Sequence, residues 1–223
     1  MGAETTVIPI FPLSDVLLFP HVRRPLHLFE PRYRQMAEHV LAGDQRLGMV
    51  TVPPEHVDAM LGDPPVYPIG CAGTVVWAQR RADGRYDLIL EGTHRFRIEN
   101  ERKSPDNRSY RVAEVALLED SSGPGDAETM AALRTRLVEL LGDLVVLSVA
   151  IPREVVSPAF LRDADDATFV NSLSNALPLS TSEKQGLLEA DGIRKRFDRL
   201  EGLLSFRRAQ LGIPGRPTTH LLH

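Results

Sequence analysis

Hydrophobic and polar positions along the chain change their spacing near residue 120. Before that point, short apolar runs are separated by Pro and Gly, and some of them alternate with polar residues. After it, leucines recur every three or four residues over long stretches. Alternation with a period of two is typical of strands, and a period of 3.6 residues is typical of helices. The pattern therefore predicts a β-rich first half and an α-helical second half.

The first half is predicted to hold six to eight short strands and a single helix. We place the helix between Pro31, which suits a first helical turn, and Gly43, a natural C-terminal stop. Tyr33, Met36 and Val40 recur at helical spacing between them. Strands with one helix do not make repeating βαβ units, so we expect a curled, largely antiparallel sheet. The predicted strands and extended segments are 7–11, 16–19, 25–29, 47–52, 70–80, 86–90, 96–98 and 110–117.

Local signals also indicate how these strands connect and end. The dipeptide Asp83-Gly84 is typical of a tight hairpin turn, so the strands on either side of it are expected to pair. The run 70–73 lacks the third glycine of a phosphate-binding loop, and we interpret it as a bend or bulge within a strand. Pro9 and Pro12 have no N–H to donate, which confines such residues to sheet edges, strand ends or bulges. We expect these Pro-rich early strands to leave an accessible sheet edge.

The second half is predicted to be a small helical bundle. Leucine stripes with polar reverse faces mark its helices, and Ser180 with Glu183 forms the capping box that starts one of them. Residues typical of turns separate the two halves between 120 and 126. The fold class is thus α+β: a mostly antiparallel, β-rich pseudo-barrel with one inserted helix, followed by an α-helical bundle. The predicted helices are 130–147, 169–177, 181–188 and 193–211, and the predicted units are 1–119, 126–213 and a flexible tail, 214–223.

Composition and charge exclude several classes of protein. The 223 residues are 43% hydrophobic and carry a formal net charge of −4, so we expect no general attraction to nucleic acid or to an anionic membrane. No apolar stretch is long enough for a transmembrane helix, and the N-terminus lacks a secretory signal. Cys71 is the single cysteine, which rules out an intrachain disulfide. A reducing, cytoplasmic location is the simplest interpretation.

A search for catalytic, cofactor and metal motifs leaves no candidate. There is no GxxxxGK[ST] loop, no HExxH pair and no GxSxG elbow, so neither ATP hydrolysis nor a zinc site nor a nucleophilic serine is predicted. Cys71 lies in an apolar strand, where a cysteine usually acts as a small buried hydrophobe. A Ser–Lys dyad needs a lysine in a dry pocket, whereas Lys184 and Lys195 fall on helix positions expected to be solvated and Lys103 falls in a polar loop. No cofactor is predicted.

Charged residues near the predicted strands favour ion pairing over catalysis. Glu30 and Glu91 each adjoin a turn beside apolar strands, so burial against Arg32 or Arg95 is expected to organise the domain. The last helix is basic, but its arginines surround the helix and no aromatic platform accompanies them. We interpret them as a solvated face, with nucleic-acid binding as the alternative. The basic residues of this helix are Arg194, Lys195, Arg196, Arg199, Arg207 and Arg208.

Several short segments, taken in order, resemble the N-terminal domain of the ATP-dependent Lon proteases. The resemblance extends over about residues 7 to 210. Its departure lies at the end, where Lon continues into a coiled helix, an ATPase module and a Ser–Lys protease whose motifs are not found here. The segments are IPIFPL (8–13), VLLFP (16–20), LFEPRY (28–33), YPIG (67–70), DGR (83–85), GTHRFRI (92–98), FVN (169–171), LPLS (177–180), EKQ (183–185) and LLE (187–189).

The resemblance implies a β-rich pseudo-barrel with one helix, then a helical bundle, and a role in binding polypeptides. We therefore expect a stand-alone bacterial protein of this kind, with neither ATPase nor protease module. We expect the residues of the family motifs to build the scaffold, with contact to a ligand as the alternative. These motif residues are Phe29, Glu30, Arg32, Tyr33, Gly92, Arg95 and Phe96.

Three functional hypotheses follow. The first is a non-catalytic module that binds polypeptides or protein partners through apolar surface, as an adaptor or holdase, and exists as a monomer or weak dimer. Its binding surface is expected at the Pro-rich strands or in the cleft between the two halves. The second is a small hydrolase with its site in that cleft, recognisable by convergent titratable groups. The third is nucleic-acid binding by the basic last helix.

Overall fold

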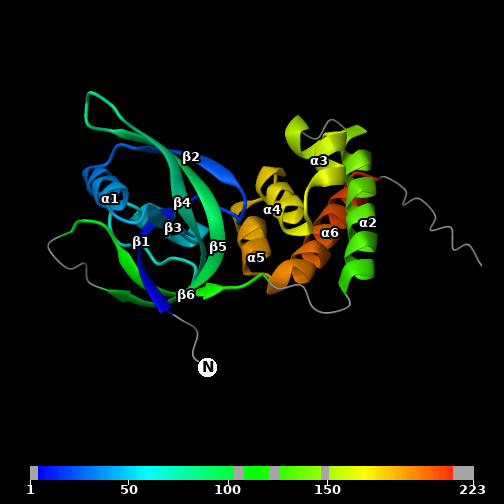
Figure 1. Cartoon of the computed structure of the whole chain (residues 1–223). Coiled ribbons are helices and arrows are strands. Elements are labelled where there is room, and N and C mark those ends of the chain that lie inside the picture. The colour runs from blue at the N-terminus through cyan, green and yellow to red at the C-terminus, as the bar shows by residue number, and fades with distance from the viewer. Residues whose placement is uncertain (1–4, 103–107, 121–125, 147–150, 213–223) are drawn as a thin grey trace, which may run out of the picture.

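The computed structural model describes residues 5–102, 108–120, 126–146 and 151–212, in which six strands are followed by a group of helices (Figure 1). Helix α1 stands between the strands, as the sequence predicts. The elements are β1 (Thr5–Leu13), β2 (Arg23–Leu28), α1 (Pro31–Ala42), β3 (Arg46–Thr51), η1 (Pro54–Ala59), β4 (Ile69–Arg80), β5 (Tyr86–Arg102), β6 (Val112–Leu118), α2 (Asp126–Val146), η3 (Arg153–Val156), α3 (Pro158–Asp163), α4 (Asp166–Ala176), α5 (Thr181–Glu189) and α6 (Gly192–Gln210).

The strands form one sheet that closes on itself. Their order is β2-β5-β4-β3-β1-β6, and a further pairing of β5 with β6 completes a ring of five strands to which β2 is added. All pairs are antiparallel except β1 with β3. Because β5 is 17 residues long, its first part pairs with β2 and its last part with β6. The predicted pseudo-barrel is therefore confirmed, and the segments predicted at 86–90 and 96–98 are two parts of one strand.

The Pro-rich strand, β1, lies inside the strand order rather than at its end, and each part of it pairs on one side only. β1 lies between two neighbours: residues 5–9 pair with β6 and residues 10–13 pair with β3. Pro9 and Pro12 fit because β1 changes its partner between them, so each part of the strand has its ladder on one side. The prediction of a strand at 16–19 is wrong. This apolar run is an irregular segment whose residues Leu17, Leu18 and Phe19 are buried. Burial rather than pairing explains its hydrophobicity.

The predicted turn and bulge are present in the β4–β5 hairpin. Gly84 has a φ of 82°, a backbone conformation that few other residues adopt, and its N–H donates to the carbonyl oxygen of Arg81 at 2.9 Å. Within the hairpin, the register shifts between Ala72 and Gly73. The glycine-containing run 70–73 is therefore an irregularity within a paired strand.

The helices confirm the leucine periodicity of the second half. Ser180 Oγ accepts from the backbone N–H of Glu183, and the Glu183 carboxylate accepts from the backbone N–H of Ser180, which is the predicted capping box. α5 contacts β4, and Figure 1 shows α4 and α5 nearest the sheet, with α2 and α6 beyond them. One cluster of buried side chains runs from the sheet, for example Leu90, to the helices, for example Phe197. The predicted tail, 214–223, lies outside the described residues.

Candidate functional site

Four of the family-motif residues lie together at the start of α1. Arg32 Nε donates to Glu30 Oε2 at 3.0 Å, and its other nitrogens donate to the carbonyl oxygens of Met60 and Gly62. Tyr33 is buried under Arg32. Phe29 differs from these neighbours, because 59% of its surface is exposed. The expected pairing of Glu30 with Arg32 is therefore present.

The other three motif residues lie on β5. The backbone of Gly92 bonds to both His21 and Val22, and Phe96 is fully buried inside the ring of strands. Arg95 points toward the helices instead, where its exposed fraction is 2%. Gly92 and Arg95 line one pocket together, and none of the other five motif residues lines it. The seven residues thus do not converge on a single site.

Arg95 takes part in a buried ion-pair network between sheet and helices. Its Nε donates to Asp120 Oδ1 at 2.8 Å, and its Nη1 donates to the carbonyl oxygen of Leu188. Arg196 of α6, also fully buried, donates to both oxygens of the same carboxylate at 3.0 Å. The expected pairing of Arg95 with Glu91 is wrong, since Glu91 bonds to Arg23 at 2.6 Å. One carboxylate therefore connects two buried arginines from the two halves of the chain.

The pocket beside this network has a volume of about 380 Å³ and is where the hydrolase hypothesis would place its site. Burial by itself raises the pKa of Asp120, but hydrogen bonds and charge from Arg196 and Arg95 outweigh it and hold the pKa below its usual range. A carboxylate with a lowered pKa and two arginine partners is a poor general base. The geometry of the pocket accordingly favours a structural ion pair over proton transfer.

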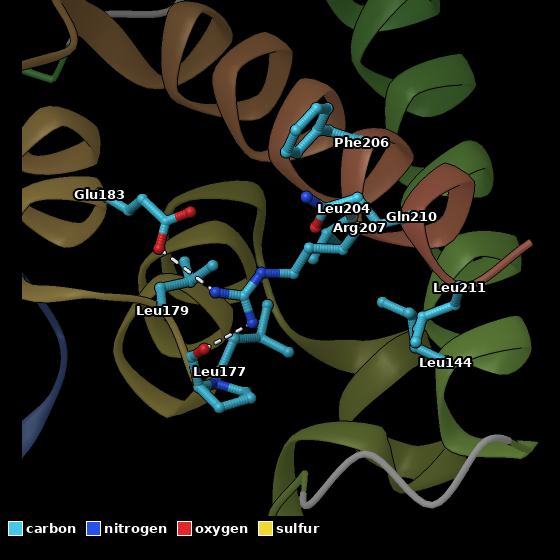
Figure 2. Close-up of a pocket in the computed structure, with 10 residues that line it drawn as sticks. Leu144, Leu177, Leu179, Glu183, Leu204, Phe206, Arg207, Gln210 and Leu211 are labelled. Atoms are coloured by element: carbon cyan, nitrogen blue, oxygen red, sulfur yellow. Dashed lines mark hydrogen bonds and ion pairs between the residues drawn. The ribbon is translucent and has the colours of Figure 1, made fainter.

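A second pocket, which we call the helical groove, is lined mainly by apolar side chains and has a volume of about 490 Å³ (Figure 2). Buried leucines of three segments form its floor: Leu144 of α2, Leu177 after α4, and Leu204 of α6. At its rim, Phe206 and Leu211 are 62% and 53% exposed. The remaining lining residues are Pro178, Leu179, Glu183, Arg207 and Gln210.

Polar contacts fix the position of one wall of the helical groove. Arg207 Nη1 donates to the carbonyl oxygen of Pro178 at 2.6 Å, and Nη2 donates to Glu183 Oε2 at 3.2 Å (Figure 2). Burial tends to raise the pKa of Glu183, but hydrogen bonds from Ser180 and the nearby Arg207 charge lower it overall. Arg207 therefore already has partners, so the surface that the groove offers to a ligand is mainly apolar.

Sequence reasoning predicted the leucine stripes but not the helical groove. It treated every stripe residue as a core residue, whereas Leu211, the last residue of the α6 stripe, is 53% exposed. Phe206 lies off the stripe that contains Leu200 and Leu204, so a large aromatic residue on the polar face was the available signal. The pocket in the cleft, one of the expected binding surfaces, has more polar lining residues than the helical groove.

Of the six basic residues of α6, Arg194, Lys195 and Arg199 are exposed as predicted, and the other three are partly or fully buried. Arg196 is buried in the ion-pair network described above, which corrects its assignment to the solvated face. Arg207 and Arg208 pair with Glu183 and Asp143, and Lys195 pairs with Asp191. Acidic partners thus offset much of the charge on this helix, which leaves less of it for a phosphate backbone.

Catalytic, metal and membrane features give no further site in the part of the chain that the structure describes. Cys71 is fully buried, and desolvation raises the pKa of its thiol far above the usual value, so it fits the predicted inert role. No three His, Cys, Asp or Glu side chains of residues 5–102, 108–120, 126–146 and 151–212 are grouped to hold a metal ion. Among these same residues, none of the helices has the length and apolar character that a membrane crossing requires.

Comparisons with known proteins agree with this architecture. A family model described as "ATP-dependent protease La (LON) substrate-binding domain" matches residues 7–205. The Lon protease of Rhizobium meliloti is 28% identical over 206 residues, which make up 91% of this chain and 24% of that protein. The Lon protease of Azospirillum brasilense is 26% identical over 208 residues, 92% of this chain and 24% of that protein.

Two solved structures share the fold. The N-terminal domain of Mycobacterium avium complex Lon protease aligns with a TM-score of 0.68 at 16% identity, covering 90% of this chain and 98% of that one. The Lon N-terminal domain protein from Xanthomonas campestris aligns with a TM-score of 0.58 at 25% identity, with the same two coverages. The ring of strands followed by helices is thus a Lon N-terminal type of fold.

The chain belongs to the family of ATP-dependent protease La (LON) substrate-binding domains, because the family model covers most of its length. The resemblance seen in the sequence is therefore confirmed. The chain spans about a quarter of the length of the curated relatives that it matches.

Proposed function

We propose that this chain is a non-catalytic polypeptide-binding module, which holds apolar segments of other proteins in the helical groove as an adaptor or holdase. The observation that carries the proposal is the pair of exposed apolar side chains, Phe206 and Leu211, beside a groove with a leucine floor. Large exposed apolar side chains beside such a groove are typical of protein interaction sites. Membership in a substrate-binding family supports the same role.

We further propose a division of labour between the two units of the chain. All residues that line the helical groove fall between Leu144 and Leu211, within the unit 126–213. The ring of strands, within the unit 1–119, then supports the helices through Arg95 and Asp120. In this proposal the buried motif residues serve the scaffold, and so does Phe29 despite its exposure.

Titration with two probes tests the proposal. The first is a short fluorescein-labelled peptide rich in leucine and phenylalanine, and the second is a carboxymethylated, permanently unfolded protein. We expect both probes to bind the wild-type chain. Binding should raise the fluorescence anisotropy of the labelled peptide and, for the unfolded protein, the light scattering of the mixture. Phe206→Ser should weaken binding about tenfold or more, because burying one large apolar side chain contributes about 1.5–3 kcal/mol.

Phe29→Ser is the matched control, since Phe29 is 59% exposed and lies on the other half of the molecule. We expect it to leave binding unchanged. An equal loss of probe binding in both variants, or a loss of binding in Phe29→Ser alone, would contradict the assignment of binding to the helical groove. Hydrolysis of peptides or of ATP by the purified wild-type chain, abolished by one substitution in it, would contradict the non-catalytic role.

A further inference from the structure

A cluster of two cations lies apart from the helical groove, where β2 meets the end of α4. Arg24 Nη2 donates to the carbonyl oxygen of Leu17 at 3.2 Å and to the side-chain oxygen of Asn175. Lys184 Nζ donates to the backbone carbonyl oxygen of the same asparagine at 2.6 Å. A single neutral residue therefore holds both positive side chains.

Neither cation has a carboxylate partner. Within the described residues, no ion pair of 4.0 Å or less involves Arg24 or Lys184. The contrast with the rest of the molecule is clear, because the buried Arg95 and Arg196 both reach Asp120. The sequence predicted a solvated Lys184, but its side chain is partly buried.

Burial makes this uncompensated charge unfavourable. Desolvation lowers the pKa of Arg24, and desolvation together with the Arg24 charge lowers the pKa of Lys184. Arg24 Nε is also buried and has no hydrogen-bond partner. The C-terminus of α4, next to Asn175, supplies the equivalent of about half a negative charge. The two positive side chains beside it leave a net positive charge of roughly one and a half elementary charges.

We propose that Arg24 and Lys184 form a binding site for an oxyanion, either a carboxylate or a phosphate group. Such a ligand would accept hydrogen bonds from the guanidinium and the ammonium and would neutralise their excess charge. Arginine and lysine side chains are the usual protein partners of both groups. The proposal does not depend on the helical groove, since its residues are different ones.

Calorimetric titration with inorganic phosphate and, separately, with acetate tests this site, at an ionic strength fixed with sodium chloride. We expect one of the two oxyanions to bind the wild-type chain with 1:1 stoichiometry. Lys184→Met should weaken that binding about tenfold or more, the usual effect of losing one charged hydrogen bond. Lys195→Met is the matched control, because Lys195 is two-thirds exposed and pairs with Asp191, and it should bind like the wild type.

Asn175→Asp provides an independent second test. It places a carboxylate where the asparagine oxygen already accepts from Arg24. We expect the variant to unfold at a higher temperature than the wild type in the absence of phosphate and to lose its response to phosphate. The proposal is overturned if neither oxyanion binds the wild type, or if Lys184→Met and the wild type bind with equal affinity. Phe206→Ser should retain oxyanion binding. A negative result for the oxyanion site is therefore distinct from a negative result for polypeptide binding in the helical groove.

Discussion

A few buried charged residues determine how the sheet joins the helices. Asp120 accepts hydrogen bonds from Arg95 of β5 and from Arg196 of α6, and its own side chain is 15% exposed. Arg196 also donates to Asn171 of α4 at 2.7 Å. Breaking a buried ion pair by removing one partner is strongly destabilising, because an uncompensated charge is left inside the protein. Asp120 therefore joins the sheet to the helices through two buried charges.

Asp120→Asn should lower the free energy of unfolding by about 3 kcal/mol at neutral pH. The effect should depend on pH in a defined direction. Since the folded pKa of Asp120 is lowered, its stabilisation is present above its unfolded pKa of about 3.9 and is lost as the pH falls through the folded value. Urea unfolding at several pH values should show the wild type and the variant converging in acid.

Asp83→Asn is the control for this prediction. Asp83 is exposed in the hairpin turn and accepts hydrogen bonds from Arg85, two residues further on, and Asn-Gly suits the same turn. It should unfold like the wild type at neutral pH. A difference between Asp120→Asn and the wild type that stays constant down to the lowest pH would contradict the assigned charge pairing.

At the scale of elements, local patterns identify the helices better than the strands. The spacing of leucines predicts α2, α4, α5 and α6, and Ser180 identifies the start of α5, because these signals lie within a few residues of each other. Strand partners lie far apart in the sequence. For this reason neither the closure of β5 on β6, nor the parallel pair of β1 and β3, nor the Arg95–Asp120 contact could be inferred from spacing.

The same distinction applies to the candidate site. Leu177 and Leu204 are recognisable as apolar helix positions, but the helical groove exists only where α2, α6 and the α4–α5 connection fail to cover each other. The apolar run 16–19 shows the reverse case. Its hydrophobicity is real, but it fills the core as an irregular segment, and hydrophobicity alone does not distinguish a strand from such a segment.

Gly92 is the position at which β5 tolerates no side chain. A Cβ atom there would lie 2.1 Å from the carbonyl oxygen of Phe19, which is backbone and cannot rotate away. Gly92→Ala should therefore destabilise the chain by about 3 kcal/mol. The same substitution at Gly202 of α6, where a Cβ would meet nothing within 4 Å, should stabilise it by about 0.5–1 kcal/mol.

Thermal and urea unfolding of the two variants measure this difference. Opposite signs are expected, because Gly92 is limited by close backbone contact and Gly202 only by helix propensity. If Gly92→Ala proved as stable as the wild type, the approach of the segment around Phe19 to β5 would be incorrect, and with it the position of the buried run 16–19.

At the scale of the whole molecule, the sheet and the helices differ in what they leave exposed. The ring of strands pairs both sides of β5 and buries residues such as Phe96, while β2, among the described residues, keeps one unpaired side and single apolar side chains such as Phe29 and Trp77 are exposed. In the helical half, two large apolar side chains that line one groove, Phe206 and Leu211, remain exposed. The ion-pair network connects the two parts and so fixes the scaffold on which the helical groove is presented.

Site-specific photo-crosslinking tests the central claim most directly. A photoreactive phenylalanine analogue is placed at position 206 in one variant and at position 29 in another, and each is irradiated with the carboxymethylated unfolded protein. Both positions are exposed to a similar extent, at 62% and 59%, so accessibility alone does not separate them. We predict crosslinks from position 206 and none above background from position 29. Crosslinks from position 29 with none from position 206 would contradict a polypeptide-binding site in the helical groove.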